Sequence, residues 1–278
     1  MMKKLRQLFI AISLMSLTFP LFAYQTYLHE FVGQTTKIRH PVAVVVPDAY
    51  LQAQQQKQAK AFKVVYLLHG YGGDYRNWFK ATDVEKYADL YQFILVAPDG
   101  NRNSWYINSK LNPASQYQSY IAKDLVTFID DTYSTQRNDR GRAITGLSMG
   151  GFGALHIAIN NQMVFGAAGS TSGGVDFTPF PNNWDINKHL GRYSSNQASW
   201  HAMSIKNNLD KLQGRSLRVI IDVGVSDFFL QVNRQLHQAM LQANLNHTYI
   251  EMPGKHNFAY WQKSIGYQMK FFAEELKD

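Results

Sequence analysis

The sequence predicts an α/β fold in which a mostly parallel sheet is covered by helices on both faces. Short, continuously apolar segments, such as residues 64–68 (VVYLL) and 93–97 (FILVA), have the length and character of fully buried strands. Segments with helical spacing of apolar residues alternate with them along the chain. Ligands bind such sheets at the carboxyl ends of the strands, so we look for chemistry at that edge.

The elements follow in order along one domain, expected over residues 24–278. We expect strands at 42–46, 64–68, 93–97, 142–145, 164–168, 217–223 and 247–252, and helices at 120–133, 151–160, 228–243 and 260–276. The polar tract 51–60 predicts an exposed excursion between two strands. Residues 172–205 have weak periodicity, which predicts an insertion over the active site.

Composition excludes several classes of protein. The 278 residues are 45% hydrophobic and 17% charged, which excludes a disordered chain and permits a large core. The absence of cysteine excludes a disulfide scaffold, a cysteine-ligated zinc or iron–sulfur site and a thiol nucleophile. The net charge is +8, but the basic residues are scattered, so we expect no nucleic-acid partner.

The first 23 residues are typical of a secretory signal peptide. Lys3, Lys4 and Arg6 precede an apolar run over 8–22, and Ala23 is a small residue at a plausible cleavage site. The alternative is an uncleaved anchor helix, although the run falls short of the roughly 20 apolar residues that a span needs. No later segment is long and apolar enough for a stable membrane span. We therefore expect an exported protein, periplasmic or secreted.

The strongest chemical signal is the G-x-S-x-G pattern of residues 146–150 (GLSMG). A predicted strand precedes it and a small-residue helix follows it, so Ser148 would lie on a strained turn with its hydroxyl exposed above the sheet. Glycines are needed at both ends because strand and helix backbones approach closely there. Ser148 is the predicted nucleophile.

A serine hydroxyl needs a base, and the base needs an orienting carboxylate. Of the histidines after Ser148, only His256 is both late in the chain and on a loop at a strand's carboxyl end. Asp227 follows the strand 217–223 and is the favoured acid, although it could also cap the next helix. Asp222 is the rival, but it lies within the strand.

The negative oxygen that forms during acyl transfer needs two preorganised N–H donors. One is the backbone amide of Met149, next to the serine. The other should come from the loop after strand 64–68, where residues 69–73 (HGYGG) are rich in glycine and Tyr71 is the predicted donor. The alternative is a tight turn without a catalytic role.

Five motifs make the sequence recognisable when they are taken in order. They are LLHGYGGDYRNW (67–78), APDGNRNSWYIN (97–108), GLSMGGFGAL (146–155), DVGVSDFF (222–229) and GKHNFAYW (254–261). Over residues 35–275 the chain resembles the esterase D-like branch of the α/β-hydrolases, which includes S-formylglutathione hydrolases, tributyrin and feruloyl esterases and the antigen 85 mycolyltransferases.

This resemblance implies a Ser148–Asp227–His256 triad, with Tyr71 and Met149 at the oxyanion positions. It also implies that no metal or organic cofactor is needed, and that Trp105 and Tyr106 lie near the substrate. Trp184 and Trp200, in the predicted insertion, could offer contacts to a sugar or an acyl chain, although aromatic residues are more often part of a core.

The function we expect is hydrolysis of short-chain acyl esters by a serine carboxylesterase, with a small-molecule or carbohydrate-linked ester as substrate. The alternatives are an acyltransferase of the mycolyltransferase type, an S-formylglutathione-type thioesterase, and a catalytically silent binding protein. Activity should rise as His256 loses its proton. The sequence leaves the oligomeric state open.

Overall fold

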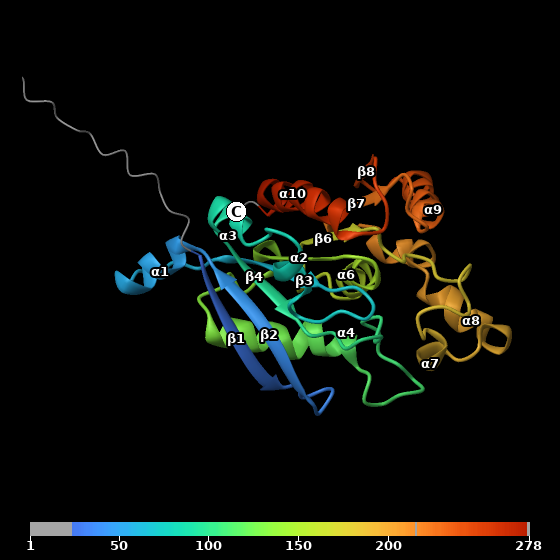
Figure 1. The fold of residues 1–278 in the computed structure, drawn as a ribbon, viewed down its shortest axis with the longest axis horizontal. Coiled ribbons are helices and arrows are strands. Elements are labelled where there is room, and N and C mark those ends of the chain that lie inside the picture. Colours follow the sequence, from blue (N-terminus) through green and yellow to red (C-terminus); the bar gives the residue numbers. More distant parts are fainter. Residues whose placement is uncertain (1–23, 215, 277–278) are drawn as a thin grey trace, which may run out of the picture.

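One eight-stranded sheet organises the computed structural model, which describes residues 24–276 except position 215. The predicted leader, residues 1–23, lies outside the described residues. The strand order is β1-β2-β4-β3-β5-β6-β7-β8 (Figure 1). The strands are β1 (Gln25–Val32), β2 (Arg39–Val46), β3 (Lys63–Leu68), β4 (Phe93–Pro98), β5 (Arg142–Gly146), β6 (Ala167–Thr171), β7 (Arg218–Gly224) and β8 (Thr248–Met252).

The sheet is parallel from β4 to β8 and antiparallel at its other edge. β1 pairs antiparallel with β2, and β2 pairs antiparallel with β4. The remaining neighbours pair in parallel. The predicted mostly parallel α/β sheet is therefore confirmed, while the edge strand β1 was not predicted. Its half-exposed, alternating pattern lacks the continuous apolar run by which we identified the buried strands.

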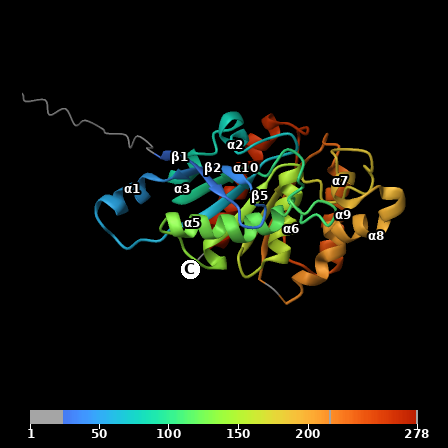
Figure 2. The same cartoon turned by 90° about the horizontal axis from the view of Figure 1, so that it is seen from below.

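Helices cover both faces of the sheet, as predicted, and form two apolar cores. Side chains of α1, α5, α6 and α9 pack in one core, and those of α2, α3 and α10 in the other (Figures 1 and 2). The helices are α1 (Asp48–Gln55), α2 (Asn77–Ala81), α3 (Lys86–Tyr91), α4 (Tyr117–Ser119), α5 (Val126–Thr132), α6 (Met149–Asn160), α7 (Asn187–Leu190), α8 (Tyr193–Met203), α9 (Leu230–Gln242) and α10 (Phe258–Glu275). Within the described residues, no helix has the length and apolar character to cross a bilayer.

Three local predictions need correction. The tract 51–60 is not wholly an excursion, because its first half belongs to α1, where Ala53 is buried against the core. The strand expected at 164–168 is β6, three residues later, since Phe165 packs in the core before the strand begins. The helix expected at 120–133 begins at Tyr117 and contains a π-helical segment, Tyr120–Leu125, between α4 and α5.

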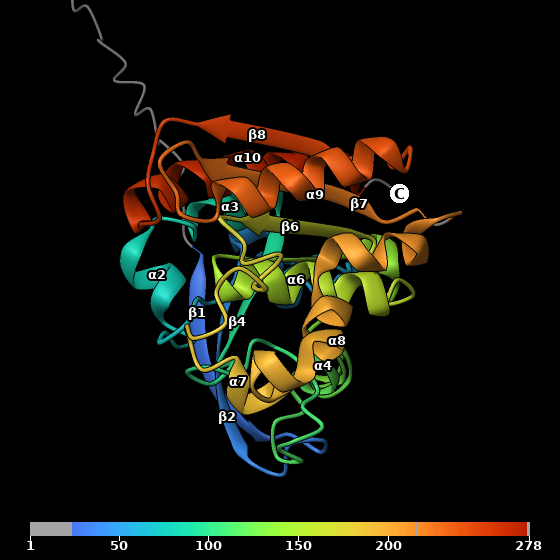
Figure 3. The same ribbon diagram turned by 90° about the vertical axis from the view of Figure 1, so that its right-hand side faces the viewer.

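The segment 172–205 leaves the sheet after β6 and returns before β7. It carries α7 and α8, which lie together at one side of the molecule (Figure 3). The side chain of Trp200 is fully buried within it, where its ring packs against Phe177 and Tyr193. Trp200 is therefore a core residue of this segment, which is the interpretation that the sequence favoured over a contact with substrate.

Candidate active site

Ser148 occupies a strained turn between β5 and α6. Its backbone angles are φ 56° and ψ −114°, a region that side-chain-bearing residues rarely adopt. Strain of this kind costs on the order of 1–3 kcal/mol and persists only when neighbouring contacts hold it. Here the Ser148 amide donates to the Thr171 carbonyl at 3.0 Å, and its own carbonyl accepts from Phe152 and Gly174 at 3.1 and 3.2 Å.

The flanking glycines permit this turn. A Cβ on Gly146 would lie 2.5 Å from the Gly150 backbone, and a Cβ on Gly150 would lie 2.3 Å from the carbonyl oxygen of Leu68. No side chain fits at those distances because β3, β5 and α6 meet there backbone to backbone. The predicted strand–turn–helix arrangement around Ser148 is therefore present, and it holds the serine hydroxyl at the carboxyl end of β5.

The structure brings together the three predicted side chains from distant parts of the chain. The Nδ1–H of His256 donates to both carboxylate oxygens of Asp227, at 2.9 and 3.0 Å. This leaves Nε2 as the acceptor, and the Ser148 hydroxyl donates to it at 2.9 Å. Hydroxyl, imidazole and carboxylate thus form one continuous hydrogen-bonded relay.

The acid and the base lie on two loops that are hydrogen-bonded to each other. Asp227 follows β7 and His256 follows β8, and the amides of Val225 and Ser226 donate to the Met252 and Gly254 carbonyls, both at 2.9 Å. Asp227 is nearly buried and also accepts the Phe229 amide at 2.8 Å. Phe229 occupies the N-cap position of α9, and the Asp227 carboxylate binds both the amide of that residue and the histidine.

The rival carboxylate, Asp222, lies in a separate buried network. Its oxygens accept from Thr171 Oγ1 and Gln268 Nε2, both at 2.5 Å. Burial raises the pKa of the Asp222 carboxyl to about 6. Asp222 therefore belongs to the packing between β6, β7 and α10, and the structure places Asp227 on the imidazole.

The two predicted oxyanion donors are unoccupied within the described residues. The backbone amide of Tyr71, after β3, and that of Met149, the first residue of α6, donate no hydrogen bond there. The amides of a helix's first turn have no partner within the helix, and the helix dipole makes that end positive. These two amides are available to an oxyanion above Ser148, and their catalytic use stays a prediction.

His69 fixes the base of the Tyr71 loop. Its Nδ1–H donates to the Gly70 carbonyl at 2.8 Å, and its Nε2 accepts the Gly100 amide at 2.8 Å. Burial lowers the pKa of this imidazole and keeps it neutral, as an acceptor nitrogen requires. The sequence predicted the loop, but it carried no signal for this tie to the loop after β4.

Trp105 and Tyr106 are buried rather than open to solvent. The Tyr106 hydroxyl donates to the His69 carbonyl at 3.1 Å, and the Trp105 Nε1–H donates to the Trp184 carbonyl at 3.0 Å. Both residues are at most 1% exposed and have positive φ angles. In this conformation they support the surrounding loops, so their contact with substrate stays a prediction.

Two aromatic side chains, Phe228 and Trp184, lie beside the histidine, and the sequence predicted only Trp184 as a candidate for substrate contacts. Phe228 is 51% exposed, and its ring centroid lies 4.1 Å from that of His256. Trp184 stacks on Phe228 at 5.7 Å with an interplanar angle of 20°. The sequence signal for Phe228 was its position directly after the predicted acid, Asp227. Trp184 was one of several aromatic residues that were candidates for substrate contacts.

In the described part of the chain, no three metal-ligating side chains gather at one point.

Comparison with known proteins agrees with this architecture. The family model described as "Putative esterase" matches residues 33–272. An acetyl esterase of Caldicellulosiruptor saccharolyticus is 22% identical and covers 88% of this chain and 95% of its own. An esterase of Mycobacterium tuberculosis is 28% identical over 78% of this chain, which spans only 52% of that longer protein.

Among solved structures, S-formylglutathione hydrolase of Staphylococcus aureus superimposes with a TM-score of 0.79 at 20% identity, covering 90% of this chain and 99% of its own. The fold is therefore the α/β-hydrolase fold, as the resemblance implied. Because the family model spans most of the chain, this protein belongs to the esterase family, and it acts on ester bonds.

Proposed function

We propose that this enzyme hydrolyses short-chain acyl esters through a Ser148–His256–Asp227 triad and an acyl-enzyme intermediate. The observation that carries the proposal is the hydrogen-bonded relay from the Ser148 hydroxyl through His256 to Asp227. Two further observations support the proposal. Ser148 has a positive φ, and the amides of Tyr71 and Met149 donate no hydrogen bond among the described residues.

Each group has a defined task in acylation. His256 Nε2 takes the proton of Ser148 as its oxygen attacks the ester carbonyl, and Asp227 stabilises the imidazolium and holds the ring in its tautomer. The amides of Tyr71 and Met149 bind the negative oxygen of the tetrahedral intermediate. When that intermediate collapses, the C–O bond to the alcohol breaks and His256 gives its proton to the leaving oxygen.

Deacylation repeats these steps with water. His256 removes a proton from water as it attacks the acyl carbonyl, and then returns a proton to Ser148 Oγ as the carboxylic acid leaves. Both half-reactions need a neutral imidazole, because Nε2 must accept a proton from the attacking oxygen in each.

The short acyl chain is the finer part of the proposal. An acetyl esterase is among the relatives, and the exposed face of Phe228 beside His256 offers an apolar contact for a small group. Trp184, stacked on Phe228, extends this face for the acyl or alcohol portion.

A panel of p-nitrophenyl esters from acetate to palmitate tests the proposal, with Ser148→Ala as the control. We expect the highest kcat/KM on acetate or butyrate, and covalent labelling by a fluorophosphonate that Ser148→Ala abolishes. Labelling that survives this substitution would remove Ser148 as the nucleophile. Preference for palmitate would overturn the short-chain assignment.

The same panel separates the alternative activities. Acyl transfer to an added alcohol in preference to water would identify a transferase, and a higher kcat/KM on S-formylglutathione would identify a thioesterase. A stable wild-type protein that neither hydrolyses any ester nor reacts with the probe would indicate a silent binding protein.

We also propose that residues 1–23 direct export and are removed. N-terminal sequencing of protein recovered outside the cytoplasm should begin at Tyr24. An intact Met1 on a membrane-bound protein would support the anchor instead.

A further inference from the structure

The side chain of Tyr71 is held by a residue that lies 114 positions later in the chain. Its hydroxyl donates to Asp185 Oδ2 at 3.0 Å. Asp185 belongs to the segment 172–205, which leaves the sheet between β6 and β7. The proposed oxyanion donor and this segment are therefore joined by a single hydrogen bond to a carboxylate, a type stronger than a bond between neutral groups.

The same carboxylate also reaches a third loop. Asp185 Oδ2 accepts from Asn103 Nδ2 at 3.0 Å, while Oδ1 pairs with Lys188 at 3.1 Å. Hydrogen bonds from Asn103, Lys188 and Tyr71 lower the pKa of this carboxyl, so it stays ionised as an acceptor at neutral pH. Its two oxygens thus have different partners, and only Oδ2 serves the loops around the site.

Asp185 is itself held in an unusual backbone conformation. Trp184 and Asp185 have φ angles of 52° and 58°, two consecutive left-handed residues that carry side chains. The Trp184 carbonyl is fixed by the Trp105 indole N–H at 3.0 Å. Because such conformations need support from their surroundings, these contacts set where the Asp185 carboxylate points.

The Tyr71 loop needs this support. The backbone before Tyr71 is tied through His69 to the Gly100 amide at 2.8 Å, and after Tyr71 the Gly72 amide donates to the Arg102 carbonyl at 2.7 Å, so the Tyr71 side chain is the part that Asp185 holds. The Tyr71 amide has no partner among the described residues, so its direction depends on how the rest of the residue is held. A catalytic donor is effective only when it is held within about 0.5 Å of the productive position.

We propose that Asp185 is a positioning residue that fixes the Tyr71 amide toward the oxyanion through the Tyr71 hydroxyl, so that the segment 172–205 completes the oxyanion hole. This inference rests on the proposed function. It gives the segment a catalytic purpose beyond covering the site, and it gives the Tyr71 side chain a role separate from that of its backbone.

The test uses Tyr71→Phe, Asp185→Ala, Asp185→Asn and the double variant Tyr71→Phe/Asp185→Ala in the full-length enzyme. We expect each of the first two to lower kcat on p-nitrophenyl acetate about tenfold with KM unchanged, short of the 10²–10³ lost with a whole oxyanion donor. The double variant should be no slower than either single one, because both remove the same hydrogen bond. Asp185→Asn keeps an acceptor and should fall between wild type and Asp185→Ala.

A second readout isolates the oxyanion hole. An alkyl trifluoromethyl ketone adds to the serine and places a negative oxygen where the intermediate's oxygen forms. Its inhibition constant should weaken by the same factor as kcat falls, whereas general loosening of the fold would show as a lower Tm without this parallel. Lys188→Gln is the matched control, since it removes the ion pair to Oδ1 and leaves the bond from Tyr71 in place; its kcat should match wild type.

Three results would overturn the inference: unchanged kcat in Tyr71→Phe, multiplicative losses in the double variant, or a change confined to KM. If Asp185→Ala does not fold, Tyr71→Phe still decides, because it removes only one hydroxyl. Failure of the proposed function is distinguishable, because the wild type itself would then neither hydrolyse the ester nor react with a fluorophosphonate.

Discussion

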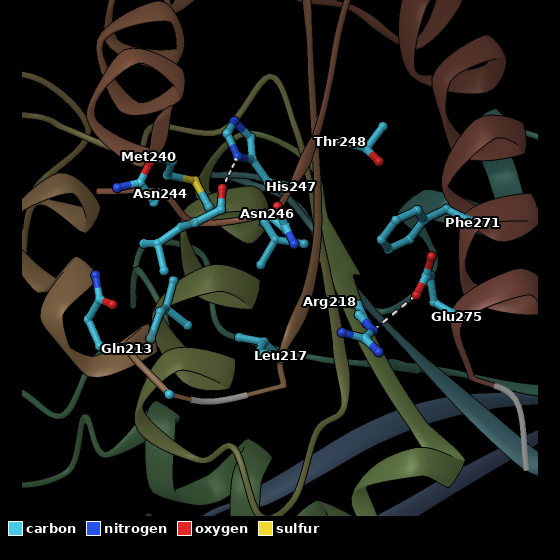
Figure 4. Close-up of a pocket in the computed structure, with 14 residues that line it drawn as sticks. Gln213, Leu217, Arg218, Met240, Asn244, Asn246, His247, Thr248, Phe271 and Glu275 are labelled. Carbon is cyan, nitrogen blue, oxygen red and sulfur yellow. Dashed lines mark hydrogen bonds and ion pairs between the residues drawn. The ribbon is translucent and has the colours of Figure 1, made fainter. Parts of the chain in front are cut away.

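The two ends of the parallel strands differ in the groups that they present. At the amino ends of β7 and β8 lies a pocket of about 590 Å³, bounded by the residues that precede those strands and by the end of α10 (Figure 4). Its ionisable side chains already have partners: Arg218 pairs with Glu275 at 3.0 Å, and both nitrogens of His247 are engaged, by the Leu245 carbonyl and by His237. At the carboxyl ends stand Ser148, Asp227 and His256.

This difference teaches that the presence of a pocket is by itself a poor guide to chemistry in this fold. The reactive groups come from loops that leave the carboxyl ends of β5, β7 and β8, where the chain turns and can present side chains above the sheet. The pocket at the amino ends has charged side chains that neutralise each other. Free amides, a strained serine and an oriented imidazole occur together only at the other end among the described residues.

Removing the nucleophile gives the largest effect and tests the catalytic side of the comparison. Ser148→Ala should lower kcat on p-nitrophenyl acetate about a millionfold, because the relay then has no attacking oxygen. The rate measurement should be paired with a Tm, which should change little. A residual rate within a hundredfold of wild type would place the chemistry elsewhere in the molecule.

The acid gives the next largest effect. Asp227→Asn should lower kcat about 10⁴-fold, since an amide can hold the imidazole in the wrong tautomer and cannot stabilise the imidazolium. The matched control is Asp222→Asn, the same change five residues earlier in the chain, which should leave kcat within a few-fold. If the two variants exchanged these outcomes, Asp222 would be the triad acid.

The Asp222 carboxyl should affect the pH dependence of the free energy of unfolding rather than the rate of catalysis. Because its pKa in the folded state is about 6, above its value in an unfolded chain, the native state holds a proton there that the unfolded state has lost. Stability should therefore fall as pH rises from about 4 to 6, on the order of 3 kcal/mol for this group. Urea unfolding at pH 4, 5 and 6.5 should show this decline in the wild type and less of it in Asp222→Asn. The same decline of the free energy of unfolding with pH in both proteins would contradict this prediction.

The pocket at the amino ends should give the smallest effect. Arg218→Ala breaks a partly exposed ion pair, which contributes about 0–1 kcal/mol to stability. We expect kcat/KM on the same ester to remain within twofold of wild type and the Tm to shift slightly. A tenfold loss of activity would mean that the two ends of the sheet are coupled and would break the comparison.

The strand–helix alternation, the nucleophile turn and the order of the site residues could all be read from the sequence. Buried parallel strands have continuous apolar runs, and the turn around Ser148 admits only glycine where backbones touch. Asp227 and His256 were found because each follows a predicted strand. The exposed edge strand β1 and the first half of tract 51–60, which belongs to α1, escaped because their patterns are weak.

Only the tertiary structure decided how the loops support one another. The ties from His69 to Gly100, from Trp105 to Trp184 and from Tyr71 to Asp185 join residues 31 to 114 positions apart. Periodicity and motifs report how a residue relates to its neighbours in sequence, whereas such bonds depend on where three separate loops come to lie above the sheet. The sequence by itself determined which groups could react, and the packing of those loops determined how each one is held.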